Sequence, residues 1–278
     1  MKLVTCLYEG KERVGALMER GVAFLPFPDM NTLIETADPA RLTAGEEVPL
    51  ASVTLLAPIP RPRQDVICLG MNYQDHEQEA AKYDSGAFGK EQPVAVYFSK
   101  RVGRAGDPGG EIPRHAWLVE RLDYEAELAV IIGKPAKNVR AEDAGDYVFG
   151  YTVLNDVSAR VLQTKHKQWY YGKSLDGFTP MGPCILTADE TAFPPALAIT
   201  ASVNGEERQR SNTSLLIHGI PEIIAELSAG MTLLPGTIIA TGTPAGVGMG
   251  LNPPKFLECG DVVECTIEGI GTLQSTVR

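Results

Sequence analysis

Alternating apolar and polar positions along the chain predict mostly β-strands, separated by turns rich in glycine and proline. The first strands are expected at "KLVTCLYEG", "RVGALM" and "GVAFLPF", and a short helix is expected at "MNTLIETA". The proline-rich stretch "APIPRPRQD" then has the composition of a linker. We therefore expect a small N-terminal β domain over residues 1–60 and a larger domain over residues 61–278.

The larger domain shows the same strand-rich pattern, with few helices. Strands are expected at "VICLG", "VAVYFSK" and "VFGYTVLND", and a hairpin at "LAITASVNGEERQR", where Asn204-Gly205 is a favoured two-residue turn. A helix is expected at "NYQDHEQEAAKYD", with Asn72 as its N-cap, and an amphipathic helix at "GIPEIIAELSAG". The stretch "SGAFGKEQPV", which directly follows the first of these helices, is expected to be a mobile loop.

Composition narrows the possible functions. Of 278 residues, 44% are hydrophobic, which is enough for a sizeable core. The formal net charge of −10 argues against binding to nucleic acid or to an anionic membrane. The five cysteines are widely spaced without a CxxC pair, so neither a disulfide framework nor a structural zinc site is expected. With no signal-peptide core and no apolar run of transmembrane length, we expect a soluble, cytoplasmic protein.

Three acids interrupt the apolar strand "LDYEAELAVIIG". Asp123, Glu125 and Glu127 occupy alternate positions, so they are expected on one face, with neighbours about 7 Å apart. Buried carboxylates at this spacing repel one another, and a divalent cation bound between them removes the repulsion. Oxygen ligands favour Mg²⁺ or Mn²⁺, with Ca²⁺ also compatible, over zinc. The alternative interpretation is that these acids lie on a solvated outer face of the strand.

Four more charged residues have both a functional and a simpler interpretation. Asp156 follows an apolar strand, where it is either a third metal ligand or an N-cap. His76 and Glu79 share one face of a predicted helix, so they form either a general base held by a carboxylate or a surface ion pair. Lys173 lies in the glycine-rich stretch "GKSLDGFTPMGP", either as a ligand for a carboxylate or as an ordinary exposed lysine.

The glycine-rich stretch "TGTPAGVGMG" has the composition of a loop that binds an anion through backbone N–H groups. It contains neither the GK[ST] ending of a P-loop nor GxGxxG, so nucleotide binding is poorly supported. Four aromatic residues, Trp117, Trp169, Tyr170 and Tyr171, are most simply explained by packing, although both tyrosines lie close to Lys173.

These motifs, in this order, resemble the fumarylacetoacetate hydrolase family. The matching stretches lie within residues 66–278 and are "LGMNYQDHEQE", "LDYEAELAVIIG", "GYTVLNDVSARVLQ", "GKSLDGFTPMGP", "SVNGEERQ" and "PGTIIATGTPAGVG". The resemblance implies a β-rich α+β fold, namely a mixed β-sandwich roll with a small N-terminal β domain. It also implies a homodimer, and it favours the functional interpretation of the charged residues.

The resemblance implies a metal centre and a catalytic base. Glu125, Glu127 and Asp156 would bind Mg²⁺ or Mn²⁺, and Asp123 would support them as a structural acid. A His76–Glu79 dyad would lie on a lid helix that becomes ordered over bound ligand. Lys173 would contact the substrate or a metal-bound water.

The resemblance also implies substrate contacts. Arg160, Gln163 and Thr243 match positions that hold the carboxylate and the oxo group of the substrate, and Tyr171 is added as a candidate because it neighbours Lys173. Departures from the family pattern concern the substrate rather than the scaffold. They include Val161 in "SARVLQ", where many members carry an acid, and the two tyrosines before Lys173.

The activity implied by the resemblance is metal-dependent hydrolysis of a C–C bond in a 2,4-dioxo acid, of the acylpyruvate or fumarylpyruvate type. His76, held by Glu79, would activate the attacking water, and the cation and Lys173 would stabilise the enolate. The same site also suits decarboxylation of oxaloacetate, or isomerisation or hydration of an unsaturated 2-oxo diacid. A non-catalytic metal- or metabolite-binding protein is the remaining alternative, and the intact set of catalytic residues argues against it.

Overall fold

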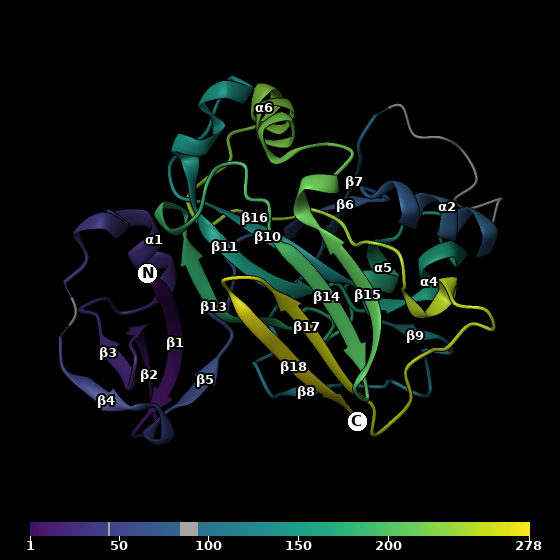
Figure 1. The fold of residues 1–278 in the computed structure, drawn as a ribbon, viewed down its shortest axis with the longest axis horizontal. Helices are drawn as coiled ribbons and strands as arrows, with labels where there is room; N and C mark the ends of the chain where they lie inside the picture. Colours follow the sequence, from purple (N-terminus) through teal and green to yellow (C-terminus); the bar gives the residue numbers. More distant parts are fainter. Residues whose placement is uncertain (44, 84–93) are drawn as a thin grey trace.

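The computed structural model describes residues 1–43, 45–83 and 94–278. Two β-sheets dominate these residues, with helices at the edges and one end (Figure 1). Both sheets contain parallel as well as antiparallel strand pairs. The expected strand-rich α+β fold with mixed sheets is therefore confirmed. Within the described ranges, no helix is both long and apolar enough to cross a membrane.

The N-terminal residues form five short strands and a helix, drawn in purple and blue in Figure 1. These elements are β1 (Lys2–Tyr8), β2 (Lys11–Leu17), β3 (Gly21–Phe24), α1 (Met30–Thr36), η1 (Pro39–Arg41), β4 (Glu47–Pro49), η2 (Leu50–Ser52) and β5 (Thr54–Leu56). Asp29 caps α1 by accepting a hydrogen bond from the Thr32 N–H. Strand β1 pairs with β13, so these strands continue the large sheet. The division into domains at residue 60 stays a prediction.

The large sheet has the strand order β4-β3-β2-β1-β13-β11-β10-β16-β6-β7, and β5 pairs with β1. Its remaining strands are β6 (Val66–Gly70), β7 (Val96–Lys100), β10 (Ala126–Ile132), β11 (Val148–Asn155), β13 (Met181–Thr187) and β16 (Ile238–Ala240). Strand β10 is central, between β11 and β16.

The second sheet has the order β15-β14-β17-β18-β8. Its strands are β8 (Glu111–Ile112), β14 (Ala198–Val203), β15 (Glu206–Asn212), β17 (Val262–Ile267) and β18 (Gly271–Val277). The predicted hairpin is β14–β15, and Asn204 and Gly205 both have positive φ, as its two-residue turn requires. A separate two-stranded ladder joins β9 (Leu122–Asp123) to β12 (Ser158–Ala159).

The remaining helices and 3₁₀ turns follow β6 in the chain. They are α2 (Gln74–Tyr83), η3 (Ala141–Tyr147), α4 (Arg160–Lys165), α5 (Tyr170–Lys173), η4 (Ala188–Glu190), η5 (Thr213–Leu215), α6 (Ile220–Gly230) and η6 (Gly248–Gly250). Helix α6 buries Ile220, Ile223, Ile224 and Leu227, as its amphipathic pattern predicted.

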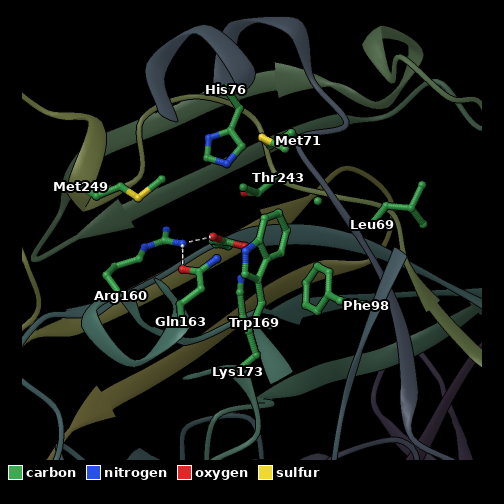
Figure 2. Close-up of a pocket in the computed structure, with 12 residues that line it drawn as sticks. Leu69, Met71, His76, Phe98, Arg160, Gln163, Trp169, Lys173, Thr243 and Met249 are labelled. Atoms are coloured by element: carbon green, nitrogen blue, oxygen red, sulfur yellow. Dashed lines mark hydrogen bonds and ion pairs between the residues drawn. The ribbon is translucent and has the colours of Figure 1, made fainter. Parts of the chain in front are cut away.

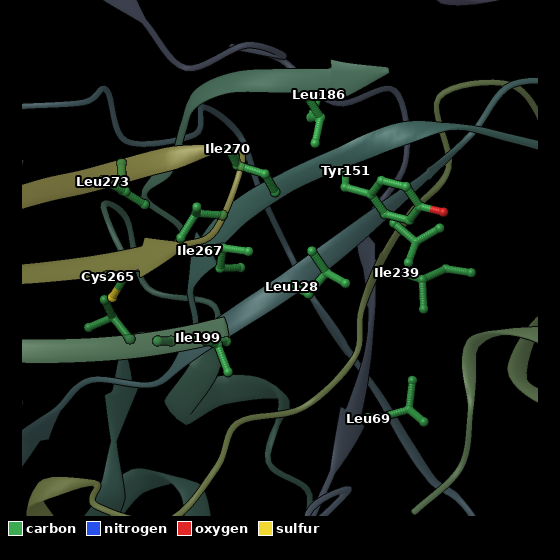
Figure 3. Close-up of a cluster of buried hydrophobic side chains, with 14 of the residues drawn as sticks. Leu69, Leu128, Tyr151, Leu186, Ile199, Ile239, Cys265, Ile267, Ile270 and Leu273 are labelled. Carbon is green, nitrogen blue, oxygen red and sulfur yellow. The ribbon is translucent and has the colours of Figure 1, made fainter. Parts of the chain in front are cut away.

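Strand β10 separates two hydrophobic clusters, because alternate side chains point to opposite faces of a strand. Leu128 and Val130 belong to the cluster between the two sheets, which Figure 3 shows with Ile199 and Ile267 from the second sheet. Ala129 and Ile131 belong to a second cluster that includes α1 residues. Every residue of β10 is buried. A carboxylate in this strand is therefore removed from water.

Two local predictions are wrong. Asn72 is not the N-cap of α2, because its side chain bonds instead to the backbone of His218 and Thr241, and the helix begins at Gln74. Lys173 does not lie in a loop, as its glycine-rich stretch indicated, because it ends helix α5; at 1% exposed it is also not an ordinary exposed lysine. The predicted loop "SGAFGKEQPV" lies almost wholly outside the described residues, since it covers residues 85–94.

Candidate active site

Three acids meet where two neighbouring strands of the large sheet end. The predicted strand from Leu122 to Gly133 is divided, because β9 ends at Asp123 and β10 begins at Ala126. Glu125 lies in this break, and its carbonyl accepts a hydrogen bond of 2.8 Å from the Asp156 N–H just after β11. One oxygen from each of Glu125, Glu127 and Asp156 lies within 4.8 Å of the others.

Burial excludes the interpretation that these acids lie on a solvated face. Glu125 is 5% exposed, Glu127 is 1% exposed and Asp156 is fully buried. Glu127 accepts a hydrogen bond of 2.9 Å from the Gly242 N–H, and no cationic group of the described residues lies within ion-pair distance of it. Burial, and then repulsion by Asp156 and Glu125, raises the pKa of Glu127 well above its usual value.

Two buried lysines compensate part of this negative charge. Lys173 donates hydrogen bonds of 2.8 Å to both Glu125 and Asp156. Lys100, at the end of β7, donates to the other oxygen of Asp156 at 2.5 Å. Burial alone would lower the pKa of Lys173, but Asp156 and Glu125 outweigh burial and raise it. Lys173 therefore remains protonated and acts as a donor. Sequence reasoning missed Lys100, whose signal is a lysine that ends an apolar strand.

The three acids have the composition and spacing of a site for a hard divalent cation. In an octahedral shell with Mg–O distances of about 2.1 Å, ligand oxygens are about 3–4 Å apart, and the larger Ca²⁺ allows about 5 Å. The limit of 4.8 Å lies within the Ca²⁺ range, and around Mg²⁺ or Mn²⁺ the three carboxylates would move closer together. The uncompensated Glu127 carboxyl also fits, because a bound cation would favour its ionised form. Sulfur and imidazole ligands are absent from the set, which disfavours zinc.

Asp123 has a structural role rather than a ligand role. It is fully buried and accepts hydrogen bonds from the N–H groups of Gly248 at 2.7 Å and Met249 at 3.0 Å. It also accepts one from Nε of Arg160 at 2.8 Å. The structure agrees with the expectation that Asp123 supports the site, in this case by fixing a guanidinium.

Arg160 presents one guanidinium nitrogen that has no protein partner in the described residues. Its Nη1 donates to Glu125 at 2.5 Å and to Gln163 at 3.2 Å, whereas the buried Nη2 has no hydrogen-bond partner. Burial alone would lower its pKa, but Asp123 and Glu125 raise it. Unpaired buried donors are rare and typically await a ligand or water. The free edge of Arg160 is therefore a candidate anion contact.

The predicted base lies above the same cavity. His76 of α2 is 5% exposed, and its Nδ1 is 3.4 Å from Oε2 of Glu79. Figure 2 shows His76 on one side of the cavity and Arg160, Gln163 and Lys173 on the other. Both oxygens of Glu79 accept from the Gly246 N–H, at 3.0 and 3.1 Å, which orients the carboxylate. His76 is thus buried and lines the cavity, and Glu79 is mostly buried, so the two do not form a surface ion pair.

The cavity is small and is lined by both polar and apolar groups. The polar lining consists of His76, Glu125, Arg160, Gln163, Lys173 and Thr243. Its apolar part includes Leu69, Met71, Phe98, Trp169 and Met249. Six of the predicted site residues therefore meet in one cavity, and Glu79 reaches it through His76. The Thr243 hydroxyl already donates to Ala126 and accepts from Gln209, which leaves it little capacity for a ligand.

Phe98 and Trp169, rather than Tyr171, are the aromatic residues that line this cavity together with Lys173. Trp169 packs edge-on against Phe98, with ring centroids 5.2 Å apart, and Lys173 Nζ lies 5.3 Å from the centre of the Phe98 ring. Tyr171 is 43% exposed and packs against His166 instead. The structure does not bring Tyr171 to the cavity, and its contact with substrate stays a prediction. Trp169 was expected only to pack against other side chains, but its ring also lines the cavity.

Comparisons with known proteins give a family match and several relatives of this chain. A family model described as "Fumarylacetoacetate (FAA) hydrolase C-terminal" matches residues 65–278. A protein from Bacillus subtilis named oxaloacetate tautomerase YisK is 47% identical over 228 residues, covering 82% of this chain and 74% of that protein.

Two solved structures resemble the whole chain. The fumarylacetoacetate hydrolase of Exiguobacterium antarcticum is 39% identical, with a TM-score of 0.84, covering 100% of this chain and 99% of the other. A 2-hydroxyhepta-2,4-diene-1,7-dioate isomerase from Mycobacterium marinum is 34% identical, with a TM-score of 0.77, and the coverage is 100% and 98%.

Proposed function

This chain belongs to the fumarylacetoacetate hydrolase family of enzymes, and on that premise we propose that it interconverts the enol and keto forms of a small 2-oxo acid of the oxaloacetate type. The observation that carries the proposal is the pairing of His76 with the unpartnered Nη2 of Arg160 across one small cavity. The guanidinium of Arg160 suits a substrate carboxylate. The imidazole of His76 suits transfer of a proton at a carbon atom near that carboxylate.

Arg160 is proposed to hold the substrate's 1-carboxylate. Its Nη2 needs an acceptor, and a charge-assisted bond to a carboxylate provides a strong one. Asp123 and Glu125 hold the rest of the guanidinium, so little conformational entropy is lost when substrate binds. The amide nitrogen of Gln163 is a second donor beside it, because its oxygen already accepts from Arg160.

His76 is proposed to move the proton at C3 of the substrate. Its ring lines the cavity, and Glu79 orients it through Nδ1, which leaves Nε2 for the substrate. A divalent cation at Glu125, Glu127 and Asp156 would supply positive charge that stabilises an enolate oxygen. Lys173 adds a fixed positive charge at the same end of the cavity, since Glu125 and Asp156 keep it protonated.

Hydrolysis of an acylpyruvate C–C bond is a second candidate, and one observation favours it. The apolar lining, which includes Phe98, Trp169 and Met249, suits an apolar acyl group better than a second carboxylate. His76 would then deprotonate a water instead of C3. Two considerations favour the tautomerase: the name of the relative that is 47% identical, and the small size of the cavity, which suits a small substrate better than a bulky acyl group. Decarboxylation of oxaloacetate would use the same residues.

Product analysis on a small panel distinguishes these activities. The purified protein with Mn²⁺ is given enol-oxaloacetate, acetylpyruvate and benzoylpyruvate, and products are identified by nuclear magnetic resonance. The proposal predicts faster conversion of enol to keto oxaloacetate, with loss of the effect in His76→Ala. Pyruvate formed from the acylpyruvates, with no acceleration of the tautomerisation, would establish the hydrolase instead.

Three further properties are part of the proposal. The cation is Mg²⁺ or Mn²⁺ because the ligands are carboxylates. The working form is a homodimer located in the cytoplasm. Size-exclusion chromatography with light scattering tests the dimer, and metal analysis of the purified protein tests the cation.

A further inference from the structure

The glycine-rich stretch "TGTPAGVGMG" has a role that the proposed chemistry does not use. Its backbone N–H groups bind anions, as its composition predicted, but these anions are two side chains of the protein itself. Gly246 N–H binds the Glu79 carboxylate, and the N–H groups of Gly248 and Met249 bind Asp123. We name residues 246–250 the glycine loop.

The glycine loop forms a closely fitted seat for Glu79. The Gly246 N–H reaches both carboxylate oxygens, and the hydroxyl of Tyr124 donates to the Gly246 carbonyl at 2.7 Å. Gly246 has a φ of +103°, and a Cβ there would overlap the carbonyl of Arg208. A Cβ on Gly250 would overlap the carboxyl group of Glu79. Glycine is therefore required at position 246 because of the backbone conformation and the Arg208 carbonyl. It is required at position 250 because a Cβ there would displace the Glu79 carboxyl group.

The other part of the glycine loop holds Arg160 in place through Asp123. Asp123 accepts two backbone hydrogen bonds from the loop and one from Nε of Arg160. A Cβ on Gly248 would come 2.6 Å from the Asp123 carboxylate. The glycine loop thus holds both Glu79, which contacts His76, and Asp123, which contacts Arg160. His76 and Arg160 themselves lie on α2 and α4, which are far apart in the sequence.

We propose that the glycine loop is a positioning device that sets His76 relative to Arg160 by seating Glu79 and Asp123. This inference rests on the proposed function, in which those two residues act on one substrate. Effective catalysis requires reacting atoms about 3–3.5 Å apart and aligned, so a small displacement of the base lowers turnover strongly. The loop residues themselves do not take part in proton transfer.

Gly250→Ala tests the seat with the least disturbance. Gly250 does not have a left-handed backbone, so alanine acts only through its Cβ, which displaces the Glu79 carboxyl. We expect kcat for enol–keto conversion to fall about tenfold or more, since an oriented base contributes roughly 10²–10⁴-fold. Affinities for Mn²⁺ and oxalate, measured by calorimetry, should change less than twofold. Gly103→Ala is the matched control, because nothing lies within 4 Å of a Cβ at that position.

A rescue experiment separates positioning from general damage. Glu79→Asp shortens the side chain by one methylene group and makes room for the new Cβ in the Gly250→Ala protein. Combining the two should leave kcat no lower than in the worse single variant, whereas independent damage would multiply. If Gly250→Ala does not fold, Tyr124→Phe removes only the hydroxyl that holds the Gly246 peptide, and kcat should fall about threefold or more, again with unchanged oxalate affinity.

Three results would overturn the inference. They are full kcat in Gly250→Ala, full kcat in Tyr124→Phe, or multiplied losses in the double variant. His76→Ala is measured in the same assay. If His76→Ala keeps full activity, the proposed function itself fails, whereas loss in His76→Ala without loss in the loop variants removes only the positioning role.

Discussion

The metal-free protein should lose stability as the pH rises, because of Glu127. Its carboxyl is 1% exposed and faces Asp156 and Glu125, so burial and repulsion raise its pKa in the folded state. In the unfolded chain, the carboxyl group of a glutamate has a pKa of about 4.3. Between these two values the folded chain binds one proton more than the unfolded chain, so stability falls with increasing pH. Glu127→Gln keeps a neutral group of the same shape and removes this dependence.

The expected size follows from linkage. One extra proton changes the free energy of unfolding by about 1.4 kcal/mol per pH unit inside that window. With about 2.1 cal/mol/K of unfolding entropy per residue, the 278 residues correspond to about 2 °C in Tm per pH unit. Thermal unfolding of both proteins in chelator, from pH 5 to 8, measures the difference between their slopes. Groups that titrate identically in the two proteins cancel in that difference.

Metal provides the internal control for this prediction. Mn²⁺ requires the ionised carboxylate, so the wild type should become more stable with Mn²⁺, increasingly so at higher pH, whereas Glu127→Gln should gain little. Parallel Tm profiles of wild type and Glu127→Gln in chelator would refute the idea that Glu127 is held neutral. A Mn²⁺ affinity that does not change with pH would refute it independently.

Three further predictions concern single side chains. Arg160→Lys removes the planar fork and the free Nη2, so KM for a 2-oxo acid should rise about tenfold or more while Mn²⁺ affinity is kept; unchanged KM would remove Arg160 as the anchor. Asp156→Asn should abolish Mn²⁺ binding and lower the free energy of unfolding by about 3–5 kcal/mol, because buried Lys100 loses its ionised partner and Lys173 keeps only Glu125; chemical denaturation checks this, and wild-type stability would contradict it. Trp169→Ala should change the ranking of acetylpyruvate, benzoylpyruvate and oxaloacetate in kcat/KM, whereas Tyr171→Ala should not; the reverse result would place Tyr171 in the pocket.

Much of the fold was predictable because its signals are local. Strand alternation, the Asn204-Gly205 turn and the amphipathic α6 depend on neighbours in sequence, and each lies where the pattern predicted. The N-cap role of Asn72 was wrong because a distant partner competed for the same amide. Its side chain bonds to the backbone of His218 and Thr241, which no local pattern reveals.

The site was predictable as a set of residue types, but not in its charge balance. Spacing alone left the acids of "LDYEAELAVIIG" open between a solvated face and a metal centre. The structure decides through burial, because β10 is central in the large sheet and covered on both faces. The pairing of Lys100 with Asp156 and the binding of Glu79 by the glycine loop could not be foreseen, since both depend on contacts between strands, loops and a helix that are distant in sequence.

The central claim is that His76 transfers a proton at C3 of a 2-oxo acid whose carboxylate Arg160 holds. The most direct measurement is the conversion of enol-oxaloacetate to the keto form in D₂O, followed by immediate reduction to malate and analysis by nuclear magnetic resonance. The wild-type protein with Mn²⁺ should deliver a single deuterium to one face of C3, and His76→Ala should give the unselective labelling of the uncatalysed reaction. Equal deuteration of both faces by the wild type, or undiminished selectivity in His76→Ala, would contradict this claim.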